Sequence, residues 1–319
     1  MRKAFIAVIT ELAEQDERII LLTSDLGYLL MESFTQKFPD RFINVGVAEQ
    51  NMVGIATGLA EAGMIPYIYS ITPFAVLRPY EFIRNGPIYH QLMVRIIGSG
   101  GGFEYPHDGI THFGIDDIGV FRVQPGLSIF APADYQQAST IFKQTWDMPG
   151  PVYYRLSKDE QTVVPGLMGK FAVGQAQLIG GGQDLLMITL GSIASEAVAA
   201  IDSLALQGIS CTLMVASSIN PPPLPTLVET LPHFRHVMTV EAHYINGGLG
   251  SLVSEFAAEG NYDCTITRCG VKTMPDGKTG SQKYLYGRFG ISREALVRTA
   301  VGLLQNRNQT CTDQQGKSE

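Results

Sequence analysis

One acidic residue, Glu49, stands in the segment Val-Gly-Val-Ala-Glu-Gln-Asn at 45–51. A β-type run at 41–45 precedes it and an apolar, glycine-punctuated segment at 52–62 follows, so we expect Glu49 at a strand-to-helix junction with apolar surroundings. A carboxyl group placed there is costly to ionise unless something compensates it, and such groups often do acid–base chemistry near neutral pH. The alternative is a helix-start carboxylate that the helix dipole favours.

A second polar segment follows a glycine-rich run, Gly-Ser-Gly-Gly-Gly at 98–102, and reads Phe-Glu-Tyr-Pro-His-Asp-Gly-Ile-Thr-His at 103–112. The glycines leave backbone N–H groups open, but the run does not match the GxGxxG pattern. His107, Asp108 and His112 could suggest a metal site, yet no cysteine or second carboxylate cluster completes a ligand shell, so we predict no metal on this chain. Contacts to a hydroxylated substrate fit these residues better, and a solvated loop is the remaining alternative.

Aromatic and basic side chains lie near these segments. Phe74 follows an apolar run and could stack on a planar heterocycle, although core or interface packing is the usual role of such a residue. Arg78 comes four residues later and could be ordinary surface charge. Arg155 and Lys158 end a β-type run and could face an anion such as a phosphate, while surface exposure is an equally open reading.

The elements that must position these residues alternate along the first half of the chain. Expected strands lie at 19–22, 42–45, 65–69, 93–98, 128–131 and 152–155, and expected helices at 3–14, 52–62, 80–88 and 135–147. This alternation predicts an α/β fold with a mostly parallel sheet covered on both faces. Ligands of such sheets bind beyond the carboxyl ends of the strands, so we expect four strand-end segments to converge on one edge. They contain Ser24, Asp25 and Leu26, then Glu49, then residues 70–78, then residues 98–112.

The whole chain is predicted to form two doubly wound domains. The first spans 1–160, and a glycine-rich linker with some short strand content spans 161–182. The second domain, 183–305, repeats the pattern, with strands at 185–189, 210–215, 236–241 and 265–269 and helices at 196–207 and 292–304. The polar residues 306–319 are expected to form a disordered tail.

Composition restricts the class of protein further. The 319 residues carry a net charge of −7, which disfavours a broad nucleic-acid-binding face but leaves room for a local basic pocket. Four scattered cysteines form no CxxC pair, so neither a disulfide framework nor a zinc site is suggested, and reduced thiols in the cytoplasm fit best. No apolar stretch reaches the length of a membrane span, and the N-terminus lacks a signal-peptide pattern.

A family resemblance connects these segments. The order of Asp25, Val-Gly-Val-Ala-Glu-Gln at 45–50, an aromatic loop, and Asp-Gly-Ile-Thr-His at 108–112 resembles the transketolase group of thiamine-diphosphate enzymes. It is similar also to the 1-deoxyxylulose-5-phosphate synthases. Glu-Ala-His at 241–243 with Gly-Gly-Leu-Gly at 247–250 resembles the C-terminal domain of the same group. The resemblance covers residues 1–305 and implies a pyrimidine-binding domain followed by a transketolase C-terminal-like domain.

The resemblance implies cofactor contacts for residues of the first domain. Glu49 would hydrogen-bond N1′ of the aminopyrimidine of thiamine diphosphate, which favours the imino tautomer whose nitrogen removes the thiazolium C2 proton. Phe74 would stack on the pyrimidine, although Ile71 and Pro73 alter the usual Ser-Thr-Phe spacing of that loop. The other implied cofactor contacts are Asp25, Leu26, Val47 and Arg78.

The resemblance also implies substrate contacts. Ser24, Asp108 and His112 would meet the sugar, with His112 also acting in catalysis. Lys158 falls where the family often has a phosphate-binding arginine, and Arg155 lies three residues earlier. The glycine-rich run at 98–102 replaces a polar segment that helps to hold phosphate in ordinary transketolases.

One motif of the family is missing. Family members hold Mg²⁺ and the diphosphate with a Gly-Asp-Gly motif and a later asparagine, and this chain has no Gly-Asp-Gly. The resemblance therefore implies the small subunit of a split transketolase, with the metal ligands on a larger N-terminal subunit in an α2β2 heterotetramer. The alternatives are the β subunit of a 2-oxo acid dehydrogenase-like E1 component, and a non-catalytic partner that kept the fold. The Asp-Gly-x-Thr-His motif argues against the first, and intact Glu49, Asp108 and His112 argue against the second.

Overall fold

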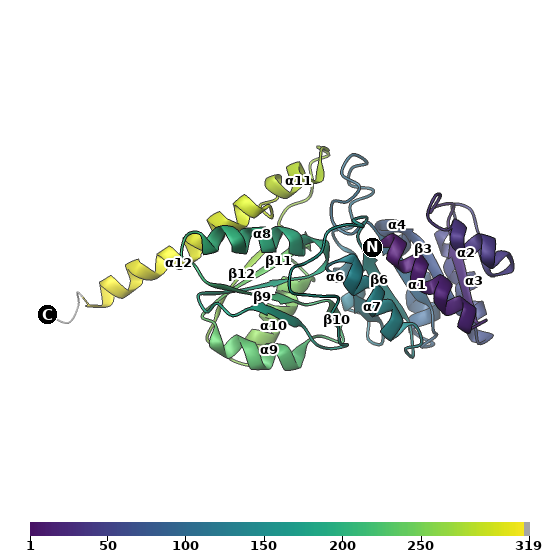
Figure 1. Ribbon diagram of the computed structural model, residues 1–319, viewed down its shortest axis with the longest axis horizontal. Coiled ribbons are helices and arrows are strands. Elements are labelled where there is room, and N and C mark those ends of the chain that lie inside the picture. The colour runs from purple at the N-terminus through teal and green to yellow at the C-terminus, as the bar shows by residue number, and fades with distance from the viewer. Residues whose placement is uncertain (316–319) are drawn as a thin grey trace.

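The computed structural model describes residues 1–315, with side chains described as far as residue 305. Two β-sheets lie side by side along the long axis of the molecule, and helices cover both faces of each sheet (Figure 1). The sheets contain seven and five strands. This architecture confirms the predicted α/β fold with two doubly wound domains, while the exact domain boundaries stay predictions.

The first sheet has the strand order β10-β5-β6-β4-β3-β1-β2. Its strands are β1 (Ile19–Thr23), β2 (Phe42–Asn44), β3 (Ile65–Ile71), β4 (Arg95–Ser99), β5 (Ser128–Phe130), β6 (Val152–Leu156) and β10 (Ser218–Asn220). All neighbouring pairs are parallel except β10 with β5. Every residue of the inner strands β1, β3, β4 and β6 is buried, as expected for parallel strands covered on both faces.

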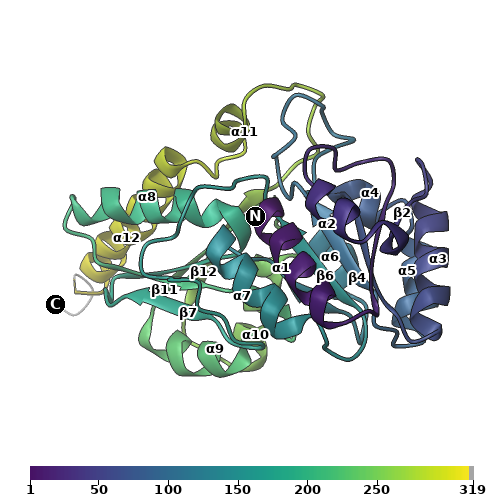
Figure 2. The same cartoon turned by 45° about the vertical axis from the view of Figure 1, so that its right-hand side comes forward.

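Two layers of helices cover the first sheet. One face carries α1 (Arg2–Gln15) and α7 (Tyr135–Thr145), which lie in front of β6 and β4 in Figure 2. Their apolar sides meet the sheet in a cluster that includes Phe5, Phe142 and Tyr154. The other face packs against α3 (Glu49–Glu61), α5 (Tyr80–Ile83) and α6 (Asp117–Arg122). Two short helices complete this domain, α2 (Glu32–Lys37) and α4 (Thr72–Val76).

The second sheet has the strand order β12-β11-β8-β9-β7. Its strands are β7 (Gln177–Gly180), β8 (Leu185–Thr189), β9 (Cys211–Val215), β11 (His236–Tyr244) and β12 (Thr265–Val271). The helices of this half are α8 (Ala194–Ala205), α9 (Leu224–Thr230), α10 (Leu249–Glu259), α11 (Gln282–Arg288) and α12 (Arg293–Gln315). The segment 306–319, expected to be a disordered tail, enters α12 as far as Gln315 and otherwise lies outside the described residues.

Some elements differ from those expected. The helix expected at 80–88 is divided into α5 and a π-helical turn, Arg84–Ile88, which contains Pro87. A proline cannot donate the backbone hydrogen bond that a regular helix needs. Strand β10 was not expected at all. It comes from the second half of the chain but extends the sheet of the first half, so the two domains share a sheet as well as an apolar cluster.

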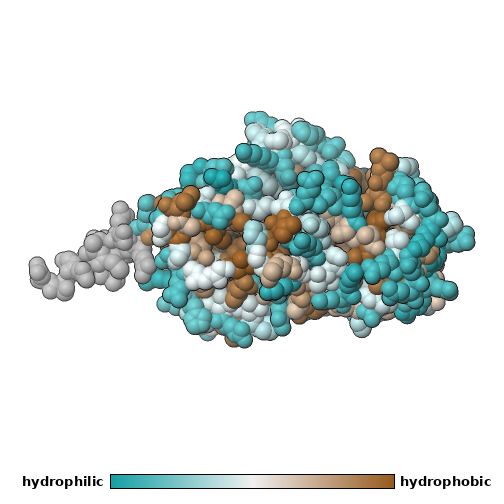
Figure 3. Space-filling model, in the orientation of Figure 1, coloured by the Kyte–Doolittle hydropathy of each residue, from teal (hydrophilic) through white to brown (hydrophobic). Residues whose placement is uncertain are grey.

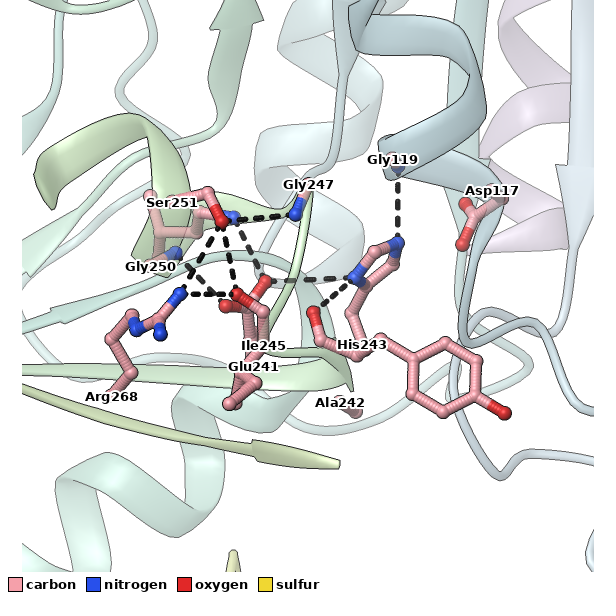
Figure 4. Close-up of polar contacts among 12 residues, drawn as sticks. Asp117, Gly119, Glu241, Ala242, His243, Ile245, Gly247, Gly250, Ser251 and Arg268 are labelled. Atoms are coloured by element: carbon pink, nitrogen blue, oxygen red, sulfur yellow. Dashed lines mark hydrogen bonds and ion pairs between the residues drawn. The ribbon is translucent and has the colours of Figure 1, made fainter. Parts of the chain in front are cut away.

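A buried polar network joins the domains (Figure 4). The guanidinium of Arg155 pairs with Asp117 at 2.8 Å and donates to the carbonyls of Gly114 and Ala242. His243 donates from Nδ1 to its neighbour's carbonyl, so Nε2 is free to accept from the backbone N–H of Gly119 at 3.1 Å. These bonds fix the first domain's strand-end loops relative to β11. Over the described part of the chain, no helix is both long and apolar enough to cross a bilayer.

Candidate active site

Glu49 is the first residue of α3 and only 2% exposed. Its Oε1 accepts hydrogen bonds from Arg78 at 3.0 Å and from Ser24 Oγ at 3.3 Å. Ser24 Oγ also lies 3.0 Å from Ser70 Oγ, so the end of β3 is linked to the carboxylate through Ser24. Arg78 supplies the compensation that a buried carboxylate needs. The Oε2 atom has no hydrogen-bond partner among the described residues and can accept one from a ligand.

Three planar side chains, a guanidinium, a phenyl ring and an imidazole, lie in contact one after another next to Glu49. The guanidinium carbon of Arg78 lies 3.7 Å from the ring centroid of Phe74, and the Phe74 ring meets the ring of His112 edge-on at 4.9 Å. Phe74 lies in the short helix α4 rather than in an open loop, and proline at the start of that helix suits its fixed φ. The structure thus brings Glu49, Arg78, Phe74 and His112 together, from segments that are far apart in the sequence.

The segment after β1 forms the rim of this site. Asp25 has φ +59° and is held by Asn44, which bonds both its backbone N–H and its carboxylate at 3.0 Å. The hydrogen bonds from Asn44 and then from Tyr28 lower the pKa of the Asp25 carboxyl. Leu26 is half-buried, and Val47 is 74% exposed. Asp25 and Val47 are therefore exposed, while Leu26 packs against the apolar cluster under α1.

The segment that contains Asp108 and His112 is anchored by aromatic packing. The Phe103 ring stacks on Phe289 of the second domain and meets Phe113 edge-on, both at 5.0 Å. In the segment between Phe103 and Phe113, Asp108 is exposed and His112 is half-buried. His112 Nδ1 lies 2.9 Å from Thr111 Oγ1.

Lys158 lies beside a second cation that the sequence did not single out. Its ammonium sits 4.0 Å from the Tyr105 ring centroid, and burial followed by repulsion from Arg2 lowers the pKa of the amine. Arg2 is the first residue of α1, and its guanidinium pairs with Glu160 at 3.7 Å. No motif marks a lone arginine at position 2, because only the packing of α1 brings it to Lys158.

Glu104 is another residue whose role no sequence pattern indicated. It accepts hydrogen bonds from the backbone N–H of Lys158 and from Ser192 Oγ, the latter at 2.7 Å, and burial raises the pKa of its carboxyl. Glu104 therefore ties the end of β6 to the second domain. A lone glutamate after a glycine run gives no sequence signal for such a role.

The placement of Arg155 does not match the expected substrate contact. The side chain is 5% exposed, and its hydrogen bonds go to Asp117 and to two backbone carbonyls of the domain junction. A guanidinium committed in this way has few donors left for a phosphate. We therefore assign Arg155 to the junction. Within the described residues, no three His, Cys, Asp or Glu side chains are grouped so as to hold a metal ion.

Comparison with known proteins agrees with this arrangement. Residues 1–162 match the family described as "Transketolase, pyrimidine binding domain", and residues 174–296 match "Transketolase, C-terminal domain". The chain is 32% identical over 309 residues to a 6-deoxy-6-sulfo-D-fructose transketolase subunit of Clostridium sp. (strain MSTE9), covering 97% of this chain and 95% of the relative. It is 34% identical to a subunit of the apulose-4-phosphate transketolase of Actinobacillus succinogenes, covering 85% of this chain and 87% of that subunit.

A solved structure, "Split gene transketolase, inactive beta4 tetramer", superimposes with a TM-score of 0.84 at 31% identity and covers 95% of this chain and 97% of that one. The fold and the family matches place the chain in a family of α/β enzymes whose members use thiamine diphosphate. The chain belongs to the transketolase family of transferases, and its full-length relatives include subunits of split transketolases.

Proposed function

We propose that this chain is the small subunit of a two-subunit transketolase that transfers a two-carbon ketol group between phosphorylated sugars. The observation that carries the proposal is the buried carboxylate of Glu49, with Oε2 open to a ligand and the Phe74 ring nearby, in a chain that matches split subunits over nearly their whole length. Magnesium and the diphosphate are assigned to the larger subunit.

The residues present fit the pyrimidine end of thiamine diphosphate. Glu49 offers a buried acceptor for a ring N–H, and Phe74 offers a half-buried aromatic surface. When bound, the cofactor supplies an electron sink through its thiazolium ring. Glu49 Oε2 would then share a proton with the pyrimidine nitrogen, while the hydrogen bond from Arg78 to Oε1 would hold the carboxyl group in place.

The sugar is proposed to enter along His112 and Asp108. His112 is fixed against Phe74, so its ring can donate to or accept from a hydroxyl group of the sugar. Lys158, whose ammonium lies over the Tyr105 ring, supplies a positive charge that suits a terminal phosphate, and Arg2, which pairs with Glu160, adds to the positive charge nearby. One relative is named for a sulfonated sugar and another for a phosphorylated one, which supports a sugar with an anionic group as the substrate here.

The surface around Glu49 fits a protein partner. Tyr28 and Leu29 are 75% and 93% exposed beside Asp25, and Val47 is 74% exposed. Hydrophobic residues protrude at the upper right of the molecule in Figure 3, in the half where Figure 1 places the first domain. Exposed apolar groups around a polar site are typical of an interface. We assign this rim to the larger subunit in an α2β2 assembly.

Reconstitution tests this proposal. The purified chain is expected to give no ketol transfer with thiamine diphosphate and Mg²⁺, and to become active when a larger subunit with the Gly-Asp-Gly motif is added. The readout is release of the aldose product from a ketose phosphate donor. Turnover by the chain alone would contradict the split site.

A further inference from the structure

A basic cavity of about 410 Å³ opens in the second domain between β12, α11 and the start of α12. Four cationic side chains line it, from three different segments: Arg268, Lys272, Arg288 and Arg298. Three threonines add hydroxyl groups, and no aspartate or glutamate lines the cavity among the described residues. Strand β12 is an edge strand of its sheet, so the cavity lies at the border of the domain.

The four cations cluster around one cavity although the chain as a whole has a net charge of −7. Lys272 and Arg298 have no hydrogen bond or ion pair with any described residue, while Arg288 pairs with Asp276 outside the cavity lining. Like charges that face one cavity repel each other, and a bound anion removes that repulsion. The grouping is therefore unfavourable in isolation and favourable around a negatively charged ligand.

One of the four cations, Arg268, is held in place by residues outside the cavity lining. Arg268 donates to the carbonyl of Ile245 at 3.0 Å and approaches Ser251 Oγ at 3.5 Å, as Figure 4 shows. Those contacts use one guanidinium nitrogen, Nη1, and leave the other N–H groups of the fork to the cavity. A pre-oriented arginine loses less conformational freedom when it binds a ligand.

We propose that this cavity is a second binding site, for the phosphate group of a small phosphorylated metabolite. Arginine forks and hydroxyl groups match the tetrahedral oxygens of a phosphate better than they match a single carboxylate. The volume lies within the range of small-ligand sites and leaves room for a sugar or nucleoside beyond the phosphate. The site is distinct from the one around Glu49, because β12 and α12 lie at the other end of the molecule from α3 (Figure 1).

Calorimetric titration of the full chain with inorganic pyrophosphate at low ionic strength tests the proposal. The variant that combines Lys272→Gln with Arg298→Gln is expected to bind at least about tenfold more weakly, since two charge-assisted contacts are lost. Neither side chain has a hydrogen-bond or ion-pair partner among the described residues, and their removal relieves like-charge repulsion, so the thermal midpoint should not fall. A matched variant, Lys143→Gln with Lys170→Gln, removes the same charge from exposed positions of the first domain and the linker and should bind as the wild type does.

A third variant separates the two proposed anion sites. Lys158→Gln should leave pyrophosphate binding at the β12 cavity intact, and this titration needs neither the larger subunit nor turnover. Titrations with ADP and with ribose 5-phosphate then tell a nucleotide from a sugar phosphate as the preferred ligand. Wild-type affinity in the Lys272→Gln, Arg298→Gln variant would overturn the proposal, and so would loss of all binding in Lys158→Gln.

Discussion

Glu49 is a buried carboxylate whose charge is balanced by a side chain that remains accessible to solvent. The sequence indicated a carboxyl group in apolar surroundings, and it left open what would compensate the charge. The structure shows that Arg78, 42% exposed at its side chain, provides the compensation and at the same time covers the Phe74 ring. One arginine therefore links the proposed acid–base group to the proposed stacking surface.

Removal of Arg78 should leave Glu49 buried without its counter-charge, with only Ser24 Oγ still bonded to it. We expect Arg78→Met to lower the free energy of unfolding by about 1 kcal/mol, a small value because the arginine is partly exposed and screened. A double-mutant cycle with Glu49→Gln, followed by urea denaturation, should give a coupling energy of similar size. Arg84→Met, further along the chain, serves as control. A coupling energy of zero would show that the pair does not stabilise the fold.

Lys158 should act on the charged end of the substrate. In the reconstituted enzyme, Lys158→Gln is expected to raise KM for a phosphorylated aldose acceptor about tenfold to a hundredfold, since a charge-assisted hydrogen bond is lost. KM for the unphosphorylated aldose should stay unchanged. Lys170→Gln is the control. An equal rise in KM for both acceptors would place Lys158 away from the phosphate.

At the scale of elements, the buried strands could be predicted because parallel strands covered on both faces are continuous apolar runs. Each expected strand is present, with ends moved by a few residues. The three-residue strand β10 could not be predicted, since it lies just before the prolines at 221–223 and is held only by pairing with β5. The role of Arg155 at the domain junction could not be predicted either. Its partner Asp117 is distant in sequence, and no local pattern joins the two residues.

The ion pair at the domain junction should contribute strongly to stability. Asp117 is fully buried and accepts from Arg155 and from the hydroxyl of Tyr153. Asp117→Asn should lower the free energy of unfolding by about 3 kcal/mol or more, because it leaves a buried guanidinium without its counter-charge. Glu11→Gln, which breaks an exposed pair with Lys143, should cost less than about 0.5 kcal/mol. Equal losses in the two variants would contradict this account of the junction.

His243 should make the junction sensitive to acid. Burial lowers the pKa of His243, with Asp117 opposing that shift and Arg155 adding to it, and Nε2 must stay unprotonated to accept from Gly119. The stability due to this group is therefore present above the unfolded pKa, near 6.5, and is lost as pH falls below it. Wild-type protein should lose up to about 1.4 kcal/mol per pH unit from this group between pH 6.5 and 5. His243→Gln should lose less over that interval in denaturation experiments, and an identical profile would contradict the prediction.

At the scale of the whole molecule, we propose that the chain contributes half of a catalytic site that a partner subunit completes. The family could be predicted from short motifs, because Glu49 and the segment 108–112 are specific together. The second cation, Arg2, and the basic cavity at β12 could not, since each depends on side chains that only packing brings together. The exposed apolar rim around Asp25 and Val47 is where a partner would complete the site.

Exchange of the thiazolium C2 proton of thiamine diphosphate for deuterium, followed by NMR, reports directly on the group that Glu49 is proposed to activate. In the complex of this chain with the larger subunit, the cofactor and Mg²⁺, Glu49→Gln should slow the exchange by about a hundredfold or more. Glu61→Gln, an exposed carboxylate at the other end of α3, should leave the rate unchanged. Exchange at the wild-type rate in Glu49→Gln would contradict the role of Glu49.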